Sequence, residues 1–147
     1  MAMDKLEMPG AFAPGAKLPA RATEGSAGYD LSAIGNWIIH PSRTVLVPTG
    51  VFLAIPAGHF GMLCARSGLS IKRSLAPINA PGIIDADYRG EVMVALHNFG
   101  WEAQAIADGE RIAQLVIVPF ASPTIVEYPE LTATARGAGG LGSTGRL

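Results

Sequence analysis

Glycine and proline divide this chain into short apolar runs, and this division constrains the fold more than any other feature of the sequence. The runs are rich in valine, isoleucine and aromatic residues, which favour the half-buried surface of a β-sheet. They recur at intervals of about eight to twelve residues, which is typical of β-sandwiches, jelly rolls and barrels. The expected strands are Trp37–His40, Thr44–Val47, Val51–Ile55, Phe60–Ala65, Glu91–His97, Arg111–Phe120 and Thr124–Tyr128.

Helical signals are confined to one short segment. The sequence has no heptad, no internal repeat and no long stretch of 3.6-residue periodicity. Residues Ser67–Arg73 favour one or two helical turns, with Ser67 as the expected N-cap. At 147 residues the chain is long enough for one domain and too short for two. We therefore expect a single all-β domain with one short helix.

The last twelve residues, 136–147, differ in composition from the rest of the chain. Five of them are glycine, at positions 137, 139, 140, 142 and 145. Such a segment buries too little apolar area to offset the entropy lost on ordering. We expect a flexible Gly-rich arm, although composition alone is more typical of a frayed chain end.

The charge of the chain excludes several classes of partner. With 11 basic and 12 acidic residues, the net charge of −1 provides no basic field for duplex DNA or an anionic membrane. The apolar runs are far shorter than a membrane span, and the beginning of the sequence lacks the regions of a signal peptide. We expect a cytoplasmic protein that binds neither nucleic acid nor membranes. The hydrophobic content of 49% is high for a small domain and suggests that apolar surface is buried between subunits.

Several common catalytic patterns are absent from the sequence. The histidines at 40, 59 and 97 do not have zinc-ligand spacing, and no G-x-S-x-G motif is present. Cys64 is the single cysteine, which excludes an internal disulfide, and its apolar surroundings in sequence predict a buried thiol. Residues 137–144 imitate a Walker A loop but lack its lysine, so a P-loop NTPase is excluded. Their glycine amides and hydroxyls remain suited to phosphate.

Two other segments carry polar groups that suit a nucleotide. At Ala65–Ser70 a strand ends in Arg66 and a helix begins at once, which places a guanidinium beside backbone N–H groups. An ordinary helix start with a surface arginine is the alternative. The segment Asn79–Glu91 places an amide, two carboxylates and a tyrosine among turn residues. Asp85 follows two isoleucines there, so we expect a pocket with Asp85 at its wall rather than a simple hairpin turn.

Five segments, taken together and in order, resemble the motifs of trimeric dUTP nucleotidohydrolases (dUTPases). They are AGYDL at 27–31, ARSGL at 65–69, NAPGIIDADYRGE at 79–91, GERIAQL at 109–115 and RGAGGLGSTG at 136–145. The resemblance covers about residues 17–145. It implies a jelly-roll-like β domain at 17–135, preceded by an N-terminal extension at 1–16 and followed by a substrate-closing arm at 136–147. It also implies hydrolysis of dUTP to dUMP and pyrophosphate, which limits uracil incorporation into DNA and supplies dUMP for dTMP synthesis.

The resemblance implies a role for individual residues. Asp85 is similar to the general base that activates the attacking water, and Asp30 to the residue that orients waters on Mg²⁺, which the substrate phosphates chiefly hold. The phosphate-binding group corresponds to Arg66, Ser67, Gly68 and Gln114. The uracil-binding hairpin corresponds to Asn79, Ile83, Ile84 and Met93, with Tyr88 against the deoxyribose. The arm corresponds to Arg136, Leu141, Gly142, Ser143 and Thr144.

The arm departs from the family pattern at one position. Leu141 stands where the family usually has an aromatic ring, or sometimes histidine, that stacks over uracil. Leucine covers a base by apolar contact but lacks a π-face, so weaker closure of the arm is expected here.

The resemblance further implies a homotrimer whose active sites are shared. Arg66 and Gln114 are expected from one chain, the 79–88 hairpin from a second and the arm from the third. Two alternatives remain at this stage. A related dCTP deaminase needs a catalytic glutamate beside the pyrimidine, for which Glu91 is the local candidate. A non-catalytic nucleotide sensor would bind dUTP without turnover.

Overall fold

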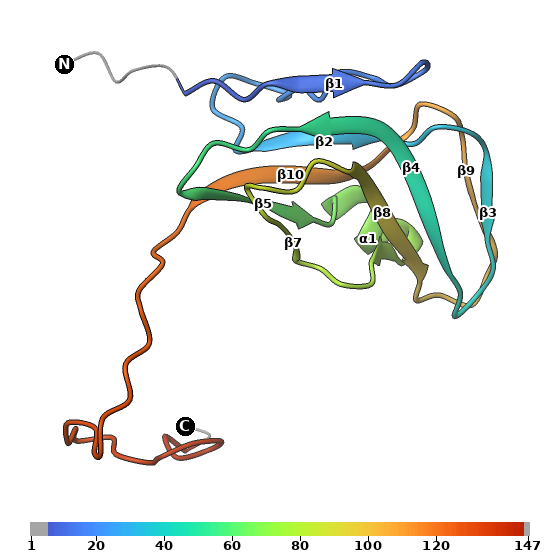
Figure 1. Ribbon diagram of the computed structural model, residues 1–147. Helices are drawn as coiled ribbons and strands as arrows, with labels where there is room; N and C mark the ends of the chain where they lie inside the picture. The colour runs from blue at the N-terminus through green and yellow to red at the C-terminus, as the bar shows by residue number, and fades with distance from the viewer. Residues whose placement is uncertain (1–5, 146–147) are drawn as a thin grey trace.

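The computed structural model describes residues 6–145 and confirms a mostly β architecture with one short helix (Figure 1). The elements are β1 Gly10–Phe12, β2 Gly28–Ser32, β3 Trp37–Ile39, β4 Thr44–Leu53, β5 His59–Cys64, α1 Ser67–Arg73, β6 Leu75–Pro77, β7 Gly82–Ile84, β8 Glu91–Asn98, β9 Gln104–Ile106 and β10 Arg111–Pro119.

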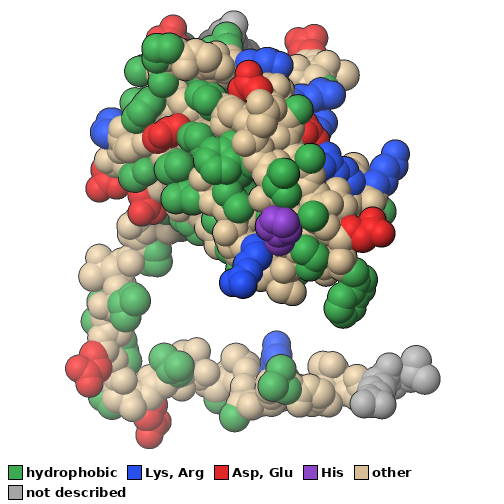
Figure 2. All heavy atoms as spheres, turned by 90° about the vertical axis from the view of Figure 1, so that its right-hand side faces the viewer, with side chains coloured by type: hydrophobic (Ala, Val, Ile, Leu, Met, Phe, Trp, Pro, Cys, Tyr) green, Lys and Arg blue, Asp and Glu red, His purple; other side chains and the backbone are tan. Residues whose placement is uncertain are grey.

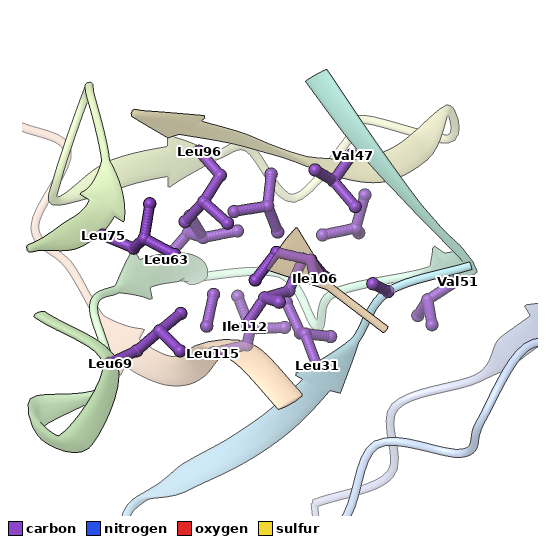
Figure 3. Packing of buried hydrophobic residues seen from close by; sticks show 14 of the residues in the cluster. Leu31, Val47, Val51, Leu63, Leu69, Leu75, Leu96, Ile106, Ile112 and Leu115 are labelled. Carbon is purple, nitrogen blue, oxygen red and sulfur yellow. The ribbon is translucent and has the colours of Figure 1, made fainter. Parts of the chain in front are cut away.

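Two antiparallel four-stranded sheets enclose the core. One has the strand order β1-β4-β8-β6, the other β2-β10-β5-β7, and β3 pairs with β9 in a small third sheet. Strand β8 alternates half-buried and buried residues throughout, because successive side chains of a strand point to opposite faces. Its buried Val92, Val94 and Leu96 belong to the same cluster as Leu31 of β2 and Leu115 of β10. Figure 3 shows side chains from both sheets converging in this interior.

Helix α1 has the predicted bounds but a different cap. Arg66 is the N-cap residue, with extended backbone angles and no side-chain capping bond, so the assignment of Ser67 as N-cap was wrong. Ser67 is already the first helical residue. Leu69 anchors the helix in the core, and Arg73 in its last turn bonds to Glu110 at 2.5 Å. These contacts hold α1 against the core and against the residue that precedes β10.

Strand β4 runs through the segment where two separate strands were expected. The predicted break at Pro48–Gly50 is instead a register shift against β8 between Pro48 and Phe52. Gly50 has a φ of +68°, a conformation that favours glycine, and its N–H donates to Glu91 Oε1 at 2.7 Å. A β-bulge thus accommodates the Pro–Gly signal without ending the strand.

The predicted strand at 124–128 was wrong. Residues 120–145 contain no strand and leave the body of the molecule after β10 (Figures 1 and 2). Ile125 is 96% exposed, so the β-prone side chains of this segment have no sheet to pack against within the chain. We call residues 120–135 the linker and 136–145 the arm. At the other end, β1 within the expected extension pairs with β4, while residues 1–5, like 146–147, lie outside the described part.

Helix α1, with seven residues, is the only α-helix in residues 6–145, and no helix in that range is long and apolar enough to cross a membrane.

Candidate active site

The predicted phosphate-binding residues come together at one end of the β2-β10-β5 sheet. Because β10 lies between β2 and β5, Gln114 is opposite Asp30 on one side and Cys64 on the other. Helix α1 starts just beyond Cys64. The resulting pocket of about 420 Å³, which we call the phosphate pocket, is lined by Ala22, Ser26, Ala27, Gly28, Asp30, Cys64, Arg66, Ser67, Gly68, Gln114 and Val116.

Asp30 is held between two arginines. Arg66 Nε lies 3.0 Å from Asp30 Oδ1, and Arg111 Nη1 lies 3.4 Å from Asp30 Oδ2. The Asp30 side chain is only 19% exposed, so this interaction is screened less than a surface ion pair. The carboxylate therefore holds one guanidinium at the start of α1 and a second at the start of β10. Two cations against one carboxylate leave positive charge for a phosphate.

Gln114 is fixed by its neighbours on both sides. Its Nε2 donates to the carbonyl oxygen of Ala65 at 2.9 Å. On the other side, a Cβ added to Gly28 would lie 2.2 Å from Gln114 Oε1, closer than real Cβ atoms approach. Glycine at this position therefore leaves the space that the amide group occupies.

The predicted base-binding residues form a second, separate pocket. Strand β7, the following turn and β8 enclose about 330 Å³, which we call the hairpin pocket. Its lining contains every residue predicted for the base, the sugar and the catalytic carboxylate: Asn79, Ile83, Ile84, Asp85, Tyr88 and Met93.

Tyr88 and Glu91 are tied to the backbone of this hairpin. The Tyr88 hydroxyl donates to the carbonyl oxygen of Glu91 at 2.9 Å, and the Glu91 carboxylate accepts the bond from Gly50 in β4. The tyrosine ring is thereby held across the turn, while Asp85 at the start of the turn is exposed. The bulge in β4 and the hairpin are joined through Glu91.

The three groups of predicted residues do not meet within one chain. The phosphate pocket and the hairpin pocket share no lining residue. Arg136, Leu141, Gly142, Ser143 and Thr144 line neither pocket and lie on the exposed arm, away from the body in Figure 1.

Sequence reasoning missed two residues and misjudged a third. Arg111, the second cation on Asp30, lies in the GERIAQL motif, but only Gln114 was selected from it. Glu91 was considered only as a deaminase glutamate, and the bulge that it bonds had been read as a strand break. Cys64 is half-buried at the phosphate pocket rather than fully buried.

The donor set fits a metal ion that is bound mainly by a ligand. In residues 6–145 no three His, Cys, Asp or Glu side chains form a cluster that could hold a metal. Each Asp30 oxygen has one arginine partner, and a carboxylate oxygen accepts a second hydrogen bond. Asp30 is thus able to orient metal-bound water while it holds Arg66.

Comparisons with known proteins agree on one family. The family model described as dUTPase matches residues 15–145. A deoxyuridine 5′-triphosphate nucleotidohydrolase from Methylocella silvestris is 53% identical over 132 residues, which cover 87% of this chain and 82% of the relative. The enzyme of the same name from Anaeromyxobacter sp. is 46% identical over 142 residues, 97% of each chain.

Solved structures give the same result. The dUTPase of Staphylococcus bacteriophage 80alpha with dUPNHPP superposes with a TM-score of 0.89 at 28% identity, covering 96% of this chain and 99% of that one. A dUTPase mutant from phage phi11 of S. aureus, described as showing the coordination of a structural Mg(II) ion, has a TM-score of 0.81 at 25% identity. It covers 87% of this chain and is itself covered completely. These neighbours confirm the expected jelly-roll β fold.

Proposed function

This chain belongs to the dUTPase family and is therefore a dUTP nucleotidohydrolase. We propose that it hydrolyses dUTP to dUMP and pyrophosphate and that Asp85 activates the attacking water. The observation that carries this mechanism is the division of the motif residues into two chemically distinct pockets. The phosphate pocket offers Arg66 and an oriented amide, with Arg111 close by on Asp30, whereas the hairpin pocket is largely apolar with a few polar groups. A deoxynucleoside triphosphate needs both kinds of surroundings.

The phosphate pocket binds and orients the triphosphate in this proposal. Ser67 and the Gln114 amide lie nearest the α-phosphate, and Arg66 and Gly68 contact the chain of phosphates. Mg²⁺, when bound, neutralises phosphate charge and favours one triphosphate conformation. Phosphate oxygens and water would be its ligands, and Asp30 would orient that water. Such a metal ion does not require a set of ligands supplied entirely by protein side chains.

Asp85 acts as the general base. Its carboxylate takes a proton from a water as the water oxygen bonds to the α-phosphorus, and the bond from that phosphorus to the bridging oxygen breaks. Pyrophosphate leaves with the electron pair, and no covalent enzyme intermediate forms. Solvent exposure of Asp85 in the isolated chain is consistent with a base that meets its water only after a partner subunit and the arm cover it.

The hairpin pocket selects uracil and deoxyribose. Uracil presents acceptor, donor and acceptor along its pairing edge, and Asn79 together with the backbone near Ile83 and Met93 matches that pattern. Cytosine would leave buried polar groups unpaired, which is costly in a site built for hydrogen bonds. Tyr88, fixed by its bond to Glu91, packs against the sugar and leaves no room for a 2′-hydroxyl.

A homotrimer with shared sites completes the proposal. Two pockets without a common residue and an arm that lines neither are what a site assembled from several chains requires. In the linker, Ile125, Tyr128 and Leu131 are largely exposed, and their apolar surface is available to a neighbouring subunit. The β domain then comprises the strands from β1 to β10, the linker follows it, and the arm of residues 136–145 closes with Arg136, Ser143 and Thr144 on the γ-phosphate. The expected role is to limit uracil incorporation into DNA and supply dUMP for dTMP synthesis in the cytoplasm.

One observation disfavours the dCTP deaminase alternative. Glu91 Oε1 accepts the N–H of Gly50 at 2.7 Å, so part of the hydrogen-bonding capacity of this carboxylate is used in the β4 bulge. A non-catalytic dUTP sensor is distinguished by turnover alone.

A pyrophosphate-release assay with dUTP, UTP, dCTP and dTTP in parallel tests the proposal. Pyrophosphate release that depends on Mg²⁺ and strongly prefers dUTP is expected. Ammonia release from dCTP would identify a deaminase, and dUTP binding without pyrophosphate release would identify a sensor. Either result refutes the proposed activity.

A further inference from the structure

A second cationic surface adjoins the phosphate pocket. We call it the basic groove: a depression of about 660 Å³ whose lining includes Lys17, Arg21, Arg66, Lys72, Arg73 and Arg111. Only two of its lining residues, Asp30 and Glu110, are acidic, so the groove has an excess of four positive charges. Six of the 11 basic residues of the chain lie there, although the net charge of the chain is −1.

Not all of these cations are neutralised by the protein. Arg73 is paired with Glu110, and Arg66 and Arg111 share Asp30. Lys17, Arg21 and Lys72, by contrast, form no ion pair within residues 6–145, and the Lys17 ammonium donates to the carbonyl oxygen of Gly109 at 3.0 Å.

Arg21 and Lys72 differ in how firmly the protein holds the cationic group. The Arg21 guanidinium bonds to the carbonyl oxygens of Glu24 and Ser26 at 2.7 and 3.4 Å and lies 5.8 Å from the centre of the Tyr29 ring. Its charge is therefore fixed at the groove. Lys72 is an exposed lysine in the last turn of α1. Both charges remain available to an anion.

The basic groove is continuous with the phosphate pocket. Ala22, Asp30, Arg66 and Gly68 line both depressions. An anion released from the phosphate pocket therefore reaches the basic groove by passing Arg66, without leaving the field of these cations. Clefts lined by charge of one sign concentrate ions of the opposite sign.

Resting on the proposed function, we propose that the basic groove is an exit subsite for pyrophosphate. The product binds there after the α–β phosphate bond has broken, at a position distinct from the one that the β- and γ-phosphates occupy in the substrate. Arg21 and Lys72 provide charge for this subsite and have no part in the hydrolytic step. Free inorganic pyrophosphate is the probe that matches this chemistry.

Titration calorimetry of the full chain with inorganic pyrophosphate tests the subsite. Lys72→Gln, Lys72→Glu and Arg21→Gln are compared with Arg43→Gln, a charge-matched control outside the groove. Removal of one exposed cation should weaken pyrophosphate binding roughly two- to fivefold, and the reversal in Lys72→Glu should weaken it further. The inhibition constant of pyrophosphate against dUTP hydrolysis should rise by the same factors. Affinity of Lys72→Gln for a non-hydrolysable dUTP analogue should stay within about twofold of wild type, since screening limits the reach of an exposed charge.

Two results would overturn the subsite. One is pyrophosphate binding by both Lys72 variants and Arg21→Gln that is as tight as binding by Arg43→Gln. The other is an equal loss of pyrophosphate and dUTP-analogue affinity in Lys72→Gln, because the lysine would then belong to the substrate site. Failure of the proposed function is a different result: the wild-type protein would release no pyrophosphate from dUTP.

Discussion

Replacement of Gly28 by alanine should damage catalysis far more than folding. The added Cβ would lie 2.2 Å from Gln114 Oε1 and 3.1 Å from Gln114 Cδ, so the amide group must move. Its bond to the carbonyl oxygen of Ala65 would break as it does so. An unpaired, partly buried carbonyl costs about 1–3 kcal/mol.

The backbone effect of the same substitution has the opposite sign. Gly28 lies in β2 without a positive φ, and alanine in a compatible conformation stabilises a protein by about 0.4–1 kcal/mol. The net loss of folding free energy is therefore at most about 2.6 kcal/mol, or a melting temperature lower by at most about 10 °C for a domain of this size. Displacement of a substrate-positioning group by about 1 Å costs roughly 100-fold in rate. We expect kcat/KM for dUTP to fall 10- to 100-fold.

Steady-state kinetics and thermal unfolding of three further variants isolate the cause. Gly25→Ala is the matched control, because a Cβ at Gly25 meets no atom within 4 Å. In a Gln114→Ala background, Gly28→Ala should cause little further loss of kcat/KM, since the colliding amide is already absent. A Gly28→Ala enzyme as active as Gly25→Ala would refute the reasoning, as would full additivity of the Gly28 and Gln114 substitutions.

Three other substitutions test the proposed roles. Asp85→Ala should slow turnover by roughly 10²- to 10⁴-fold without changing the oligomer, and near wild-type kcat would exclude Asp85 as the base. Tyr88→Ala should relax discrimination against UTP more than against dCTP, as judged from kcat/KM ratios; an equal fall in both would remove Tyr88 from the sugar contact. Leu141→Phe should lower KM severalfold to about tenfold, near the low end of the roughly 1–3 kcal/mol that stacking an aromatic ring on a base contributes. Unchanged affinity for a non-hydrolysable analogue, with the arm ordered in both complexes, would show that position 141 does not cover uracil.

The elements predicted correctly from the sequence are those whose conformation depends mainly on neighbouring residues in the chain. Strand β8 was predicted because a β-prone apolar run lies between turn residues, and α1 because Ser67 favours the start of a short helix. Strand β4 was divided wrongly because Pro48 and Gly50 signal a turn, whereas Gly50 forms a bulge held by Glu91 across 41 positions of sequence. Short strands such as β6 and β9 have three residues each and exist through pairing with distant partners.

The candidate site was predicted residue by residue from the motifs, but its arrangement was not. Local sequence places Asn79, Asp85 and Tyr88 within one segment of thirteen residues, 79–91, and in the structure all three line one pocket. It does not show that Arg111 reaches Asp30 over 81 positions, since that contact depends on the β2–β10 register. The strand expected at 124–128 failed for a related reason, because β-propensity without a partner edge makes no strand.

Because the linker is exposed, the protein can lose its activity while its β domain stays folded. In the single chain Tyr128 and Leu131 are exposed on a backbone that belongs to no sheet, which is the kind of segment that proteases cleave without prior unfolding until a neighbouring subunit covers it. One cut there would release the arm and leave every strand from β1 to β10 intact. Circular dichroism, melting temperature and size-exclusion profile would report a sound protein that no longer closes over its substrate. Intact-mass spectrometry would detect the loss of a fragment smaller than about 20 residues. It therefore reports the loss of activity in such a preparation better than any probe of folding.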